Sequence, residues 1–311
     1  MMAVFRSLKR MWLASGHDFF RQLNFELQKM IGRKRTLIGF GVFVLLELLF
    51  GLLLMREESV KQIKEMISRG NPMKGMGRFL ESLGEGFYDY YYSSLTIAYL
   101  ILSISVVFIG GLFLALVAGD IVSKEEEDGT LRMVLSRPVT RGRLLAVKYV
   151  ASFVFTCVLM GFAALSTLLV AFIFWKADGG MFAESKGLGM VAFHDFGPGL
   201  WRYLVSVPFL ALSMMVVTSL AFMFSCFRMK PATATSMTLA LLFIDIILRR
   251  TGPLRDIKHV FITSRMNSWQ LMLDEEINWG LLVHNFGLLF MICGVFFFFG
   301  WSAFSRRDFK S

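Results

Sequence analysis

Six long apolar runs dominate this sequence and decide what the chain can fold into. They lie near residues 37–55, 93–118, 144–175, 203–226, 231–248 and 279–303. A helix needs about 20 apolar residues to cross the hydrocarbon core of a bilayer, and four of the runs offer such a length without a charge. Hydrophobic residues make up 56% of the chain and charged residues 18%, against about 45–50% and 25% in soluble domains. The pattern predicts an all-α integral membrane protein with six transmembrane helices and excludes a soluble enzyme or a disulfide scaffold.

The distribution of basic residues predicts how these helices are oriented. Six spans place both chain ends on the same side of the membrane. The segments on that side hold 19 Lys or Arg in 78 positions, whereas the segments on the other side hold 14 in 92. Because loops rich in Lys and Arg stay in the cytoplasm, we expect both termini there. The chain then divides into a cytoplasmic amphipathic segment (1–36), a six-helix transmembrane domain (37–303) and a cytoplasmic tail (304–311).

The segment before the first span has its own helical pattern. Phe19, Leu23, Leu27 and Met30 recur at helical spacing, and residues 33–35 are all basic. This pattern predicts a helix that lies in the cytoplasmic membrane interface. The alternative is a short helix packed on other cytoplasmic segments. The segment lacks the apolar core of a secretory signal peptide, so the first span is expected to act as the insertion signal.

The loop between the second and third spans has the most informative sequence. Ser123 and Glu126 have the spacing of a capping box, which predicts a short helix that starts near Lys124, and Pro138 would stop it. Leu131 and Leu135 then share one face. Three or four turns with so few apolar residues form no core of their own, so this face must meet lipid headgroups, the chain's own cytoplasmic ends or a partner protein. The acidic cluster at residues 125–128 argues against anionic headgroups.

The same stretch resembles a known signature. It reads Glu125-x-Glu127-x-Gly129-Thr130-Leu131-x-x-x-Leu135-Ser136-x-Pro138-Val139-x-Arg141-x-x-Leu144-Leu145-x-x-Lys148, and it resembles type-2 ABC transporter permeases of the multi-copper maturation or drug-export kind. The resemblance implies that residues 124–137 form a coupling helix that docks on an ATP-binding subunit. The residues it implicates in coupling are Glu125, Glu127, Gly129, Thr130, Leu131, Leu135, Pro138 and Arg141. It also implies an exporter in the bacterial cytoplasmic membrane, built from two permease chains, expected to be a homodimer, and two ATPase chains.

The sequence contains no G-x-x-x-x-G-K-[ST] phosphate loop. We therefore expect no cofactor on this chain, and ATP with Mg²⁺ on a separate ATPase subunit. No enzymatic activity is expected of the chain itself, and its positive charge is explained by membrane orientation, without nucleic-acid binding.

Two acidic residues lie within the predicted spans. Glu47 stands near the middle of the first span, where a charge is costly, so it should face protein or water. It either lines a pathway or is a protonated acid bonded to a neighbouring helix. Asp245 in the fifth span has Arg249 one turn later and predicts an interfacial ion pair. Thr233, Thr235, Ser236 and Thr238 give the fifth span a composition suited to close helix contacts, as a dimer face, a pathway lining or plain packing.

Other features narrow the remaining classes of function. Cys157, Cys226 and Cys293 are spaced without a metal or disulfide pattern, and His284 stands alone, so no metal site is predicted. Residues 269–273 are apolar enough to re-enter the membrane. The alternatives to a transporter subunit are an integral membrane enzyme, which would need converging catalytic groups, and an ATPase-coupled subunit that transmits force without transport.

Overall fold

Membrane-length helices make up most of the described structure. The computed structural model describes residues 19–62, 90–131, 140–175, 177–185, 190–250 and 261–307. Within these residues, six helical segments are long and apolar enough to cross a membrane. They are α2 (Lys34–Leu54), α6 (Ser94–Ser105) continued through the π-helical turn η1 (Val106–Gly110) into α7 (Gly111–Glu127), α9 (Arg141–Phe174), α10 (Phe196–Ser225), α11 (Pro231–Arg250) and α13 (Trp279–Ser305). The predicted all-α integral membrane fold is confirmed.

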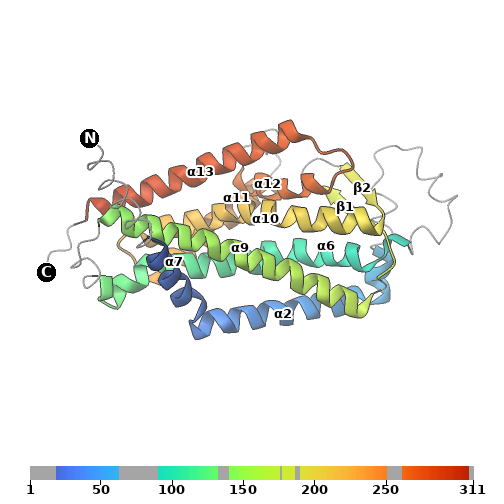
Figure 1. The fold of residues 1–311 in the computed structure, drawn as a ribbon, viewed down its shortest axis with the longest axis horizontal. Coiled ribbons are helices and arrows are strands. Elements are labelled where there is room, and N and C mark those ends of the chain that lie inside the picture. The colour runs from blue at the N-terminus through green and yellow to red at the C-terminus, as the bar shows by residue number, and fades with distance from the viewer. Residues whose placement is uncertain are drawn as a thin grey trace, which may run out of the picture.

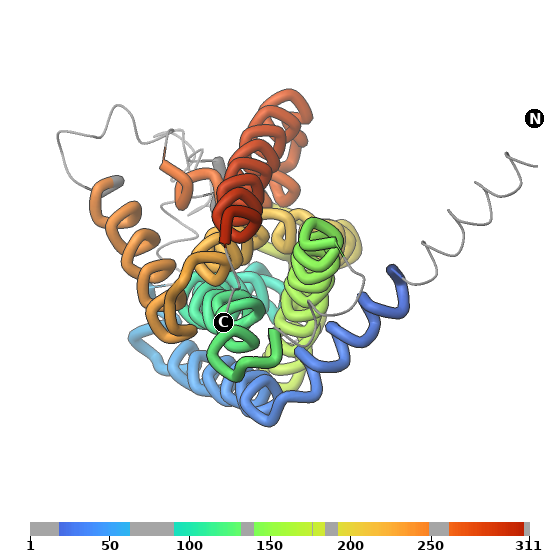
Figure 2. The backbone as a smooth tube through the Cα atoms, turned by 90° about the vertical axis from the view of Figure 1, so that its left-hand side faces the viewer, coloured from blue at the N-terminus to red at the C-terminus, as the bar shows by residue number. Residues whose placement is uncertain are grey.

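The helices run side by side along the long axis of the molecule (Figure 1). In Figure 2, α10 and α7 lie in the middle, and α2, α11 and α13 lie at the periphery. Helix α10 contacts α7, α9, α11 and α13 and is the most buried of the six. The peripheral helices expose large apolar side chains, among them Val283 and Phe290 on α13 and Phe243 on α11. These faces suit lipid or another membrane chain.

The two ends of the bundle differ. One end carries the start of α9, the end of α7, the end of α13 and the helix over residues 19–31, and we call it the terminal end (Figures 1 and 2). The opposite end carries a two-stranded sheet, and we call it the hairpin end.

The N-terminal helix, over residues 19–31, turns the predicted face inward. Leu23, Leu27 and Met30 pack against the main hydrophobic core of the bundle. Phe20 and Phe25 are instead exposed, at 69% and 67%. The face that we predicted to lie in the membrane interface is therefore packed on the bundle, as in the alternative prediction. The bundle offers this face a larger apolar surface than the headgroup region does. The exposed phenylalanines remain able to meet lipid.

Helices α7 and α11 approach closely at one glycine. A Cβ atom added at Gly119 would lie 2.9 Å from Oγ1 of Thr235 and 3.4 Å from its backbone nitrogen. The Thr235 hydroxyl donates to the carbonyl oxygens of Ala115 at 3.4 Å and Pro231 at 3.2 Å. The close helix contact predicted for the fifth span thus exists, through Thr235. Thr233 and Ser236 are exposed on the other side of α11.

We expect Gly119→Ala to destabilise the protein by about 1–2 kcal/mol, because the added methyl group forces α7 and α11 apart. Gly111 on the same helix has no atom within 4 Å of an added Cβ. Gly111→Ala should therefore leave the thermal midpoint of unfolding unchanged or raised, since alanine favours a helix. Equal midpoints of unfolding for the two variants would show that the close approach of Gly119 to Thr235 does not require a glycine.

The hairpin end holds a sheet that the sequence did not predict. Strand β1 (Met181–Ser185) pairs antiparallel with β2 (Met190–His194), with Met181 opposite His194. The sheet is tied to α6, since the Phe182 amide donates to Oγ1 of Thr96 at 2.8 Å. Strands this short, in a loop with glycines and charges, give little period-two signal.

Residues 269–273, which are apolar enough to re-enter the membrane, are buried inside the bundle, and their re-entry stays a prediction. They belong to the 3₁₀ helix η3 (Met266–Leu273), which follows α12 (Ile262–Arg265) and packs on α10 and β1. Trp269 is 3% exposed, and its ring centroid lies 6.0 Å from that of Tyr99. The apolar side chains of this segment are therefore covered by α6 and α10.

A buried aspartate follows η3. Arg202 of α10 donates to the backbone carbonyls of Asp274 and, at 2.8 Å, Glu275. His194 Nε2 lies 2.7 Å from the Leu273 carbonyl, and burial lowers the pKa of its ring. Burial raises the pKa of Asp274 from 3.8 to about 6, and Arg202 only partly offsets this. The folded state therefore favours the protonated form of Asp274 more than the unfolded state does.

This pKa predicts how stability depends on pH at the hairpin end. A raised pKa in the folded state means that the contribution of Asp274 is fully present below pH 3.8 and is lost as pH rises through about 6. Asp274→Asn should therefore stabilise the protein at pH 7.5 by about 1–2 kcal/mol and leave it unchanged near pH 4. Glu276 is an exposed neighbour, so Glu276→Gln should leave the stability unchanged at both pH values. The measurement is the thermal midpoint of the three proteins against pH. The His194 contribution is common to all three and cancels.

Candidate functional site

A buried ion-pair cluster lies at the terminal end, and Lys148 is its centre. Lys148 sits in the second turn of α9 with its side chain 1% exposed. Its ammonium group donates to Oε1 of Glu125 on α7 at 2.8 Å and to Oε1 of Glu26 on the N-terminal helix at 3.0 Å. The side chain of Glu125 is 4% exposed and that of Glu26 is 13% exposed. Charges this deeply buried require partners, so the three elements are held in one arrangement.

Lys29 completes the cluster. Its ammonium group pairs with the same Oε1 atom of Glu125. The cluster thus consists of two cations, Lys29 and Lys148, and two anions, Glu26 and Glu125, and is neutral as a unit. The N-terminal helix supplies one charge of each sign. It is therefore bound to the bundle by charge as well as by its apolar face.

A second set of contacts brings the end of α13 to the same place. Nη1 of Arg307 pairs with Oε2 of Glu126 on α7 at 2.7 Å. Nη1 of Arg141, in the first turn of α9, donates to the backbone carbonyls of Ser305 at 3.0 Å and Arg307 at 2.8 Å. The N-terminal helix, α7, α9 and α13 are thus joined at the terminal end, where α7 ends and α9 begins.

The predicted start of a short helix near Lys124 is wrong. Thr130 and Leu131 are helical again after the turn that follows α7, and the rest of the predicted helix lies outside the described residues. Helix α7 continues without a break to Glu127, so the acidic residues end a long helix. The Ser123 hydroxyl donates to the Gly119 carbonyl four residues earlier at 2.5 Å and caps no N-terminus. Carboxylates are unfavourable at a helix C-terminus, but here each of the last residues has a basic partner: Lys124 pairs with Glu127 at 2.9 Å and with Asp128 at 3.2 Å. These pairs account for an acidic cluster at the wrong end of a helix.

The chain turns immediately after α7. Gly129 has a φ of +71°, the left-handed conformation that glycine adopts most easily. The Thr130 hydroxyl donates to the Glu125 carbonyl at 3.3 Å. Leu131 is 2% exposed and belongs to the main core, so it packs inside this chain and is not free to anchor a partner. Leu135 and Pro138 lie outside the described residues.

The predicted coupling residues therefore separate into two groups. Glu125 and Arg141 form internal contacts of the terminal end, whereas Glu127 is exposed beside the turn. Sequence reasoning missed Glu26, Lys29 and Arg307 as their partners. The available signal was Lys148 itself, a lysine placed inside a predicted span, which must find acidic partners.

Glu47 is fully buried on α2, as its position within a span requires. Neither carboxyl oxygen has a hydrogen-bond partner among the described residues. The polar side chain that faces the carboxyl group is that of Ser166 on α9. Nearby on α9 and α10, the hydroxyls of Thr167 and Tyr203 lie 2.8 Å apart. Whether Glu47 lines a pathway or only packs stays a prediction.

Asp245 has partners that the sequence did not predict. Its carboxylate accepts from the backbone amides of Ile262 at 3.3 Å and Thr263 at 2.8 Å, and from the Thr263 hydroxyl. It thus holds the start of α12 against α11. The side chain of Arg249 lies outside the described part of the chain.

The remaining candidates for chemistry stand apart from one another. The three cysteines are free, and His284 is exposed on α13. Within the described ranges, no group of three or more His, Cys, Asp or Glu side chains is placed to hold a metal ion. What the terminal end offers is therefore a junction of charged side chains from four elements.

Comparison with known proteins identifies the family of this chain. The profile of the ABC-2 family transporter protein matches residues 23–251, from the N-terminal helix to the end of α11. No match is found among curated proteins. The matched range contains Glu26, Lys29, Glu125 and Lys148, so the buried ion-pair cluster lies within the family domain. The chain belongs to the ABC-2 family of transporter proteins and is a multi-pass transmembrane subunit of an ABC transporter.

Proposed function

We propose that this chain is the permease of a bacterial ABC exporter and that a separate ATPase subunit acts on the segment between α7 and α9. The observation that carries the proposal is the junction at the terminal end. Four elements meet there through buried or nearly buried ion pairs, around the one segment that resembles a coupling signature. The outward direction of transport follows from the same resemblance.

The mechanism we propose is a change in the population of two arrangements of the bundle. ATP and Mg²⁺ bind on the partner, and closure of the ATPases displaces the turn at Gly129. The long α7 and α9 helices carry this displacement through the membrane to the hairpin end. A partner shifts such an equilibrium only by binding one arrangement more tightly than the other. Two permease chains with two ATPases make the complete transporter, with the terminal end in the cytoplasm.

Charge reversal beside the turn tests this proposal. Glu127 and Asp128 are exposed there, with side chains at 44% and 50%. In the Glu127→Arg, Asp128→Arg double variant, we expect the amount of co-purified ATPase to fall about tenfold, since two like-charge contacts cost on the order of 1.4 kcal/mol together. The readout is ATP hydrolysis in the eluate, with mass spectrometry to identify a chain that contains a phosphate loop.

The matched control reverses two exposed acids at the other end of the bundle. Glu57 and Glu58 follow α2 and are exposed. Glu57→Arg, Glu58→Arg makes the same change in net charge and should leave the co-purified ATPase within about twofold of the wild type. Equal loss in both variants, or an ATPase that binds none of the three proteins, would contradict the proposed docking site.

A further inference from the structure

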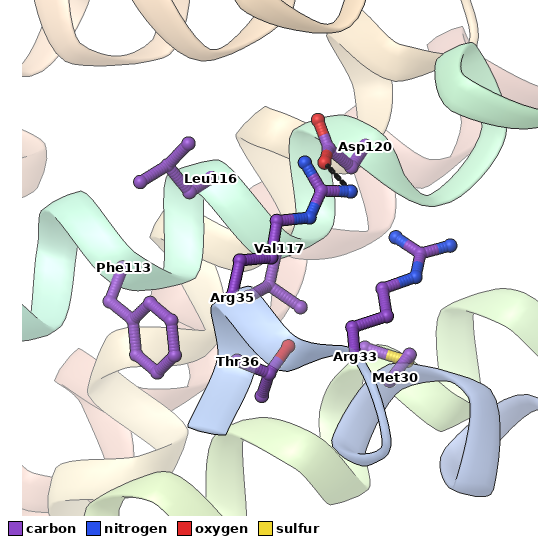
Figure 3. Close-up of a pocket in the computed structure, with 8 residues that line it drawn as sticks. All are labelled: Met30, Arg33, Arg35, Thr36, Phe113, Leu116, Val117 and Asp120. Carbon is purple, nitrogen blue, oxygen red and sulfur yellow. Dashed lines mark ion pairs between the residues drawn. The ribbon is translucent and has the colours of Figure 1, made fainter. Parts of the chain in front are cut away.

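A small pocket at the terminal end is lined by two arginines that face one carboxylate. It lies between the end of the N-terminal helix, the first turn of α2 and the last turns of α7, and has a volume of about 50 Å³. Figure 3 shows its lining residues: Met30, Arg33, Arg35, Thr36, Phe113, Leu116, Val117 and Asp120. The volume exceeds that needed for one water molecule several times over, and is enough for a phosphate-sized group.

The charges of the pocket are unbalanced. Arg35 forms an ion pair with Asp120, whose side chain is 5% exposed (Figure 3). Arg33 acts on the same carboxylate at longer range and makes no ion pair with any described residue. One guanidinium group is therefore in excess at this place. Helix α2 also begins here, and no side chain caps its N-terminus, so the helix dipole adds to the positive potential.

The pocket lies at the depth of lipid headgroups. Helix α2 has 21 residues, which at 1.5 Å per residue span about 30 Å, the thickness of the hydrocarbon core. Its first turn, with Arg33 to Thr36, must then stand at the boundary between hydrocarbon and headgroups. On the membrane side, the wall is apolar and partly open, since Leu116 is 42% exposed. An acyl chain that descends from the pocket would contact this wall.

We propose that the pocket binds the phosphate of an anionic membrane phospholipid. Arg33 and Arg35 hold the phosphate oxygens, because guanidinium groups match phosphate in bidentate geometry. The apolar wall at Phe113 and Leu116 contacts the start of an acyl chain. The phosphate competes with Asp120 for Arg35. Because Asp120 belongs to α7, which leads to the turn at Gly129, lipid occupancy loosens the contact between α2 and α7.

Native mass spectrometry of the purified full-length chain tests the site without any ATPase, so the result is independent of the proposed coupling. The probes are phosphatidylglycerol and phosphatidylcholine, added separately to the detergent-solubilised protein. The wild type should retain about five times more phosphatidylglycerol than phosphatidylcholine, and Arg33→Gln should remove most of this preference. Lys34→Gln is the matched control. Lys34 is exposed and adjacent but does not line the pocket, so this variant should stay within about twofold of the wild type.

A third variant separates binding in this pocket from general attraction to a basic surface. Asp120→Asn removes the carboxylate that competes for Arg35 and should increase phosphatidylglycerol retention, by about two- to fivefold. The proposal is overturned if Arg33→Gln and Lys34→Gln lose the lipid equally, if Asp120→Asn does not increase retention, or if the wild type retains both lipids alike. Complete displacement of the lipid by millimolar inorganic phosphate would likewise overturn it, since a free anion would then be the ligand.

Discussion

Lys148→Met is expected to destabilise the protein by about 3–5 kcal/mol, because it leaves buried carboxylates without their partner. Glu26 loses its ammonium contact at 3.0 Å, and Glu125 keeps only Lys29. The methionine side chain fills nearly the same volume, so the loss reports charge and not a cavity. In thermal unfolding, the midpoint should fall by roughly 10 °C.

Two further variants show whether the unpaired charge is the cause. Adding Glu125→Gln to Lys148→Met removes a buried charge and should recover at least about half of the loss. Lys124→Met also deletes a lysine with two acidic partners at this end of the bundle, but that side chain is 35% exposed. Its effect should stay within about 1 kcal/mol. Equal effects of Lys124→Met and Lys148→Met on stability would show that the burial of Lys148 does not increase the cost of removing its charge.

The transmembrane architecture was predictable from the sequence because the bilayer imposes it. A span must be long, apolar and helical, so each apolar run maps onto one observed helix. The predicted ends were less accurate. The second span was expected to end near residue 118, whereas α7 reaches Glu127. The acidic residues in the last turns of α7 have basic partners, and a count of apolar residues does not detect such partners.

The buried cluster was not predictable in the same way. Glu26 and Lys148 are 122 positions apart, and Lys29 and Glu125 are 96 apart. Local spacing carries no information about pairs that only the packing of helices brings together. The capping box at Ser123 failed for a related reason. The motif is defined by a three-residue spacing, and this spacing occurs equally well in the last turn of a helix whose acids are paired elsewhere.

The pair of Glu126 and Arg307 permits a charge-swap test of the junction, and this test depends on the proposed coupling. We expect Glu126→Arg and Arg307→Glu, each alone, to lower the ATPase activity of the co-purified complex about tenfold, because each places like charges about 3 Å apart and releases α13 from α7. The double variant restores an ion pair of opposite polarity and should return activity to within about twofold of the wild type. The thermal midpoint of each variant, measured in parallel, separates loss of coupling from loss of folding. Should both single variants remain folded and fully active, α13 would have no part in transmission, and the junction would reduce to the N-terminal helix, α7 and α9.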